Sequence, residues 1–344
     1  MKLGVVLRTT GPTPKLDMDM VLEAERLGYE SAWTSEAWGG DAVSTASWVL
    51  ARTSKIKVGT GIMQMPARTP SCAAMTAMSL QALSGDRFLL GIGPSGPQVI
   101  EGWHGVPYDA PLGRTREIIE ICRIVWRRER LQYDGRYYQL PLPAGKGTGL
   151  GKPLKTIMHP KPTIKIYTAS IAPAGLRVAG EVADGVLPYL MAPEKADAIL
   201  KPLREGLAAS PGKTLADFDN APYVRIRMGD DVAACRDAIR PGLAFYIGGM
   251  GARSKNFYND LVKRMGYEEA AIRIQDLFLD GKRNEAAAAV PDALIDETCL
   301  IGPPARIKDR LQAWQALARD NQVGTLLLAD ANIDALRVVA EAVP

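Results

Sequence analysis

The sequence is poor in the residues that build metal sites and hydrolytic sites. It has two histidines and four cysteines in 344 residues, and no two of the cysteines form a CxxC pair. Isolated cysteines of this kind are typical of reduced, mostly buried thiols in a cytoplasmic protein. We therefore expect a cytoplasmic location and no metal site.

Long apolar runs and clustered charge are also lacking. No apolar stretch reaches membrane length, and the short apolar run at 3–7 fits a first strand better than a signal peptide. The formal net charge is only +4, and no basic run dominates. We expect no membrane or nucleic-acid partner, so the predicted partner is a small molecule.

Strand-like and helix-like segments alternate along the chain. Strands are expected at 3–7, 30–34, 56–60, 87–93, 163–169, 185–190, 222–228 and 323–329, and helices at 16–28, 42–53, 70–84, 113–129, 172–183, 193–209 and 332–342. Eight such units predict an α/β fold of the (β/α)8 TIM-barrel type. A doubly wound sheet is the alternative, although it usually has fewer strands.

Two insertions interrupt this alternation, at about 131–162 and 242–300. The second follows the seventh strand and so begins on the face where barrel active sites lie. It is interpreted as a lid or wall, or alternatively as a packing or oligomer element. No linker divides the chain, so a single domain spanning 1–344 is predicted.

The third strand raises a question at "VGTGIMQMPARTP", residues 58–70. Gly59 and Gly61 stand at the strand end, where glycine weakens a strand and packs nothing. A bulge, an unusual peptide geometry or a flat ligand that touches backbone would each explain them.

The ends of the other predicted strands carry small residues and no Ser–His–Asp set, metal cluster or obvious carboxylate pair. Such a site suits an extended cofactor that brings its own reactivity. After the fifth strand, Pro173 opens a helix whose free amides can hold an anion.

Four stretches together resemble the luciferase-like superfamily, and more closely its coenzyme F420-dependent oxidoreductases. They are "AERLGYESAWTSEAW" (24–38), "KIKVGTGIMQMPARTP" (55–70), "GDRFLLGIGPSGPQVIEGWHG" (85–105) and "IYTASIAPAGLRVAGEVADG" (166–185). The resemblance covers nearly the whole chain. It implies F420 as the cofactor, hydride transfer at the deazaflavin C5, and a homodimer.

The resemblance also implies a non-prolyl cis peptide at Gly61–Ile62, in a bulge behind the deazaflavin ring. The cofactor-binding residues that it implies are Ser35, Gly61, Ile62, Met63, Gly93, Ser170, Ile171, Ala172 and Gly175.

The chain departs from the sugar-phosphate dehydrogenases of this superfamily. Where they have a histidine and a glutamate, it has Ala37 and Ser95-Gly96, so their substrate is not carried over. His104, in the loop after the fourth strand, is the candidate proton donor, and a structural histidine beside Trp103 is the alternative. Glu36 is the second catalytic candidate.

Three functions remain open from the sequence. The first is an F420-dependent oxidoreductase acting on an unidentified small organic substrate. The second is an FMN-dependent luciferase-like monooxygenase, and the third is a flavin- or deazaflavin-binding protein without catalysis.

Overall fold

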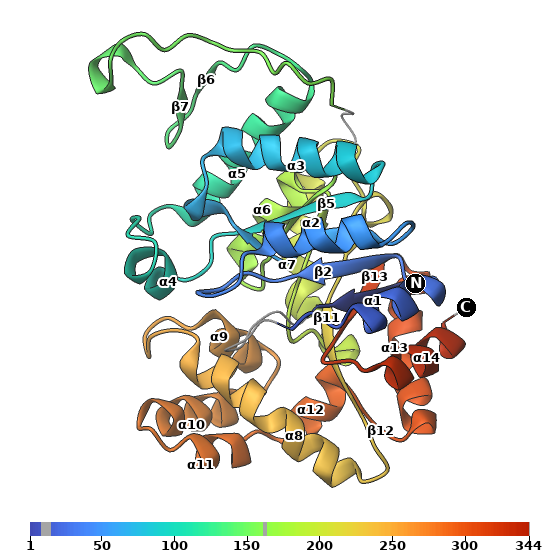
Figure 1. Ribbon diagram of the computed structural model, residues 1–344. Coiled ribbons are helices and arrows are strands. Elements are labelled where there is room, and N and C mark those ends of the chain that lie inside the picture. The colour runs from blue at the N-terminus through green and yellow to red at the C-terminus, as the bar shows by residue number, and fades with distance from the viewer. Residues whose placement is uncertain (8–14, 161–163, 344) are drawn as a thin grey trace. The chain divides into compact units, whose positions relative to one another are not determined.

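The computed structural model describes residues 1–7, 15–160 and 164–343 (Figure 1). Three predicted features lie outside the described residues: Arg8-Thr9, which follow the first predicted strand, the start of the fifth strand at 163, and the last residues of the first insertion. The chain forms two compact units, which are described separately. The first contains residues 1–7, 16–32 and 170–343, and the second contains residues 15, 33–160 and 164–169. β2 (Ser31–Thr34) contributes residues to both.

The first unit alternates parallel strands with helices. Its strands are β1 (Lys2–Val6), β9 (Gly185–Val186), β10 (Asp219–Asn220), β11 (Tyr223–Met228), β12 (Cys299–Gly302) and β13 (Thr325–Ala329). β13 pairs with β1 and β11, β12 pairs with β11, and β9 pairs with β10, all in parallel. Their residues are largely buried, as expected for parallel strands covered by helices.

The helices of the first unit are α1 (Met18–Arg26), α6 (Pro173–Val182), α7 (Asp197–Ala208), α8 (Val232–Ala244), α9 (Phe257–Arg264), α10 (Glu268–Leu279), α11 (Arg283–Ala288), α12 (Asp292–Thr298), α13 (Pro304–Arg319) and α14 (Ile333–Ala342). Short helical turns lie at η3 (Pro193–Lys195) and η4 (Leu215–Asp217), and a π-helix at η5 (Phe245–Gly249). α8 to α11 lie together (Figure 1), and the predicted insertion at 242–300 consists mostly of η5 and of α9 to α12. The insertion ends in the parallel strand β12, at residues 299–302, which was not among the predicted strands.

The second unit is built on the parallel strands β3 (Lys57–Thr60), β5 (Phe88–Gly93) and β8 (Ile166–Thr168), paired in the order β8-β5-β3. A short strand, β4 (Met63–Gln64), follows β3 and pairs with the end of β5. The helices are α2 (Ala42–Arg52), α3 (Pro70–Ser84), α4 (Pro97–Gly102) and α5 (Pro111–Trp126), with a helical turn at η1 (Met65–Ala67).

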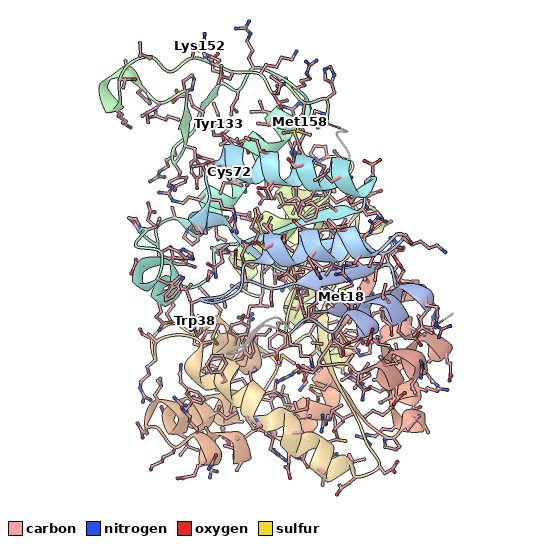
Figure 2. All side chains as sticks on the ribbon, viewed as in Figure 1. Met18, Trp38, Cys72, Tyr133, Lys152 and Met158 are labelled. Carbon is pink, nitrogen blue, oxygen red and sulfur yellow. The ribbon has the colours of Figure 1, made fainter. Side chains whose placement is uncertain are left out.

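The first insertion extends beyond α3 and α5 of its own unit, as Tyr133, Lys152 and Met158 show in Figure 2. It contains an antiparallel hairpin of β6 (Tyr133–Asp134) and β7 (Gln139–Leu140), and the turn η2 (Ala144–Lys146). The buried Glu117 of α5 fixes the hairpin, because its carboxylate accepts hydrogen bonds from the backbone N–H groups of residues 136–138 at 2.8–3.0 Å.

No described helix is both long and apolar enough to cross a lipid bilayer.

Candidate active site

The Trp33 side chain forms the floor beneath the strand ends of the second unit. Its ring is 1% exposed and packs edge-to-face on Tyr167, with ring centroids 5.0 Å apart. A Cβ atom on Gly59 would overlap the Trp33 ring, and one on Gly91 would overlap the Thr60 carbonyl. Gly59 is therefore required for side-chain packing, an explanation that the sequence analysis did not include.

Glu36 lies just past β2 in a network of charged hydrogen bonds. Arg68 donates to both of its carboxylate oxygens, at 2.8 and 2.9 Å, and the Gln64 backbone N–H donates to it at 2.6 Å. Arg68 also pairs with Asp41, whose carboxylate caps α2 by accepting from the Ser44 N–H at 2.6 Å. The two side chains of the Glu36–Arg68 pair are only 9% and 17% exposed. This bidentate pair ties the end of β2 to the segment after β4.

The charges in this network support one another. The hydrogen bond with Glu36 is the main cause that raises the pKa of Arg68, so its guanidinium stays charged. Burial opposes the charged form of Asp41, but the hydrogen bond with Ser44 and the nearby charge of Arg68 outweigh it and lower the Asp41 pKa. Both Glu36 oxygens already accept hydrogen bonds. This arrangement suits a residue that positions its neighbours better than one that exchanges protons.

His104 is held by the buried side chain of Gln64. Its Nε2 lies 2.7 Å from Gln64 Oε1, while Gln64 Nε2 faces the Glu36 carbonyl oxygen at 3.4 Å. A carbonyl oxygen can only accept, so the amide nitrogen must face Glu36 and the amide oxygen must face His104. His104 therefore carries a proton on Nε2. Its Nδ1 is the atom left to take up or release a proton.

Five of the predicted cofactor contacts belong to the second unit, as this network does. Ser35, Gly61 and Ile62 are half-buried and so keep an accessible face, whereas Met63 is fully buried in the core. Gly93 is also buried, and a Cβ there would lie 3.1 Å from the Ile62 side chain. The predicted cis peptide at Gly61–Ile62 is confirmed.

The remaining predicted contacts belong to the first unit, at the start of α6. Ser170, Ile171 and Ala172 are half-buried and Gly175 is buried. Pro173 occupies the first helical position, as predicted, and no side chain caps this end. Arg264 of α9 donates a hydrogen bond from Nη2 to the Ile171 carbonyl oxygen at 2.9 Å. Free amides and a nearby guanidinium are groups that hold an anion.

Gln64, Arg68 and Asp41 were not among the predicted site residues. The sequence offers one signal for Gln64, which stands between two methionines that are buried in the structure. A buried amide side chain needs hydrogen-bond partners, so a polar residue at this position indicates a hydrogen-bonded site. Asp41 and Arg68 read in the sequence as ordinary surface charges, and no local pattern pairs either of them with Glu36.

Comparison with known proteins gives the family. Residues 1–321 match the family described as luciferase-like monooxygenase. A protein of Mycobacterium tuberculosis, provisionally named as a coenzyme F420-dependent oxidoreductase, is 40% identical over 321 residues, which are 92% of each chain. The chain belongs to the luciferase-like monooxygenase family. Proteins of this family are oxidoreductases, and this chain is an enzyme of that class.

Two solved structures carry the same fold. The F420-dependent tetrahydromethanopterin reductase of Methanopyrus kandleri superimposes with a TM-score of 0.79 at 22% identity and covers 99% of this chain and 98% of its own. An F420-dependent secondary alcohol dehydrogenase in complex with an F420–acetone adduct gives 0.72 at 16% identity, over 100% and 98%. The predicted luciferase-like (β/α)8 barrel is confirmed.

Proposed function

We propose that this enzyme is a coenzyme F420-dependent oxidoreductase that transfers a hydride between C5 of the deazaflavin and a small organic substrate. The main support is the M. tuberculosis relative, which carries this cofactor in its name and matches 92% of the chain. The structure adds that the accessible strand ends at Ser35, Gly61 and Ile62 are small or apolar and can approach a flat ring.

F420 would supply the hydride chemistry, and the chain would supply position and a proton. Backbone and side-chain atoms of Ser35, Gly61 and Ile62 fit the flat ring, and Gly93 supports Ile62 from behind. In the first unit, the start of α6 and Arg264 are suited to hold an anionic group.

We propose that His104 moves the proton that accompanies the hydride. When a substrate carbon gains a hydride, the atom bonded to that carbon gains a proton, and the reverse reaction releases both. Gln64 holds Nε2–H of His104, so Nδ1 is the atom that gives or takes this proton. Glu36 acts through Gln64 and Arg68 as a positioning residue.

An FMN-dependent monooxygenase is the second candidate, because the family as a whole is described by that chemistry. The third possibility left open by the sequence, a flavin-binding protein without catalysis, is set aside because the chain is an enzyme. We further propose a homodimer in the cytoplasm that binds neither nucleic acid nor membrane.

Fluorescence titration of the purified protein with F420 and with FMN separates these functions. We expect micromolar binding of F420 and at least tenfold weaker binding of FMN. Tighter binding of FMN would overturn the cofactor assignment.

A further inference from the structure

The first insertion contains a segment that has no core of its own. This arm, residues 141–160, has only the short turn η2 as regular structure, and none of its residues is buried. It still carries four large apolar side chains that are between 54% and 92% exposed: Leu142, Leu150, Leu154 and Ile157. Segments of this length without secondary structure are uncommon in compact domains unless they have a function.

Hydrogen bonds to the preceding chain nevertheless hold the arm in place. The Leu131 N–H donates to the Leu154 carbonyl oxygen at 2.8 Å, and Arg128 Nε donates to the Thr156 carbonyl oxygen at 3.4 Å. The arm extends beyond α3 and α5 of its own unit (Figure 2). The fold therefore presents these apolar side chains to the outside and does not cover them.

The helix α3 of the same unit has a second apolar surface without a cover. Residues 69–85, which contain α3, include no charged residue. The solvent side of a surface helix is usually charged or polar. On α3 it instead exposes Met75 at 59% and Leu83 at 86%, together with Cys72. Such a face is typical of a helix that packs against another element.

We propose that the arm of one copy of this chain packs on α3 of a second copy, and that the contact is reciprocal. This inference rests on the homodimer proposed above and names its interface. A two-fold axis makes each contact occur twice, so a single partner covers both apolar surfaces.

Charge and area both suit this contact. The arm has no Asp or Glu and α3 has no charged residue, so the contact brings no like charges together. The six large apolar residues of the arm and α3 expose roughly 800–900 Å², which is about what each partner buries in a standard interface. A segment that inserts into a membrane surface is normally an amphipathic helix, and the arm is not helical.

Sedimentation velocity of the full chain tests the arm. We expect the wild type to be a dimer, and a variant with Leu150→Ser, Leu154→Ser and Ile157→Ser to dimerise at least tenfold more weakly. Its circular dichroism spectrum should not change, because none of these side chains is buried. A variant with Ile272→Ser and Leu279→Ser, which alters exposed residues of α10, is the control and should dimerise like the wild type.

Crosslinking locates the contact without disturbing the apolar surface of α3. Leu154→Cys should be linked by a bismaleimide to the exposed Cys72 of the second copy, and so give a covalent dimer on a denaturing gel. Adding Cys72→Ser should abolish this dimer.

A wild-type protein that stays monomeric would overturn both this inference and the proposed homodimer. A stable dimer that forms equally well in the triple serine variant, or gives no Cys72-dependent link, would overturn the arm contact and leave the homodimer. Binding of the wild type to anionic phospholipid vesicles, lost in the triple serine variant, would show that a membrane covers the arm and would overturn the second copy as its partner. These readouts are independent of the F420 titration.

Discussion

Gly59 is the residue on which the floor of the candidate site most depends. We predict that Gly59→Ala lowers the free energy of unfolding by roughly 1–3 kcal/mol, because its methyl group would enter the space of the buried Trp33 ring. Urea denaturation measures this loss. Gly39→Ala is the matched control, since a Cβ there meets nothing within 4 Å, and it should unfold like the wild type. Equal stability of the two variants would contradict this account of Gly59.

His104 is expected to serve chemistry more than stability. His104→Ala should lower turnover by roughly 10²–10⁴-fold if the residue is the proton donor. Its melting temperature and its affinity for F420 should change little, because the side chain is half-buried and the ring contacts lie elsewhere. Single-turnover oxidation of the bound reduced cofactor is the measurement. Normal turnover in a folded His104→Ala protein would show that His104 is not the proton donor and has a structural role instead.

Gln64→Leu separates positioning from proton transfer. It removes the hydrogen bond to His104 Nε2 and keeps the size of the side chain, so single-turnover oxidation of the reduced cofactor should slow less than in His104→Ala.

At the scale of elements, the Glu36–Arg68 pair joins the end of β2 to the turn η1. Arg68→Met should destabilise the protein by roughly 2–4 kcal/mol, because it leaves the Glu36 carboxylate buried beside Asp41 without a counter-charge. Adding Glu36→Gln should restore part of this loss, since it removes the uncompensated charge. A double-mutant cycle by urea denaturation measures the coupling. Additive losses would show that the pair is not a unit.

Long periodic segments were predictable from the sequence, and short ones were not. β5 and α3 agree with the expected 87–93 and 70–84 to within one residue, because apolar runs with clear glycine and proline boundaries define them. β12 was missed because its four residues follow α12 directly, without a turn signal. β4 has only two residues, and its pairing with β5 depends on tertiary contacts.

The candidate site was also predictable from the sequence only in part. The glycine-rich strand end and the cis peptide at Gly61–Ile62 followed from a local motif and its resemblance to a family. The Glu36–Arg68–Asp41 network joins residues that are about thirty positions apart, so no local pattern indicates it.

At the scale of the whole molecule, buried tyrosines predict sensitivity to alkaline pH. Burial raises the pKa of Tyr189, Tyr223, Tyr246 and Tyr258, so the folded state favours their neutral forms. Their contribution to stability is complete below the unfolded pKa of about 10 and is lost as the pH rises from there toward the folded values. The melting temperature should therefore fall between about pH 10 and 11.5. The fall should be smaller in a variant that carries Tyr189→Phe, Tyr246→Phe and Tyr258→Phe, and an equal fall would contradict this cause.

The central claim is hydride transfer from reduced F420, and an isotope measurement tests it most directly. Reduced F420 carrying deuterium at C5 is mixed with the enzyme and a panel of small ketones and enones, with and without oxygen. The products are analysed by mass spectrometry. Our account predicts oxidation of F420 without oxygen and one deuterium bound to carbon in the product. A product that forms only with oxygen and contains an oxygen atom from it would contradict the account and indicate a monooxygenase.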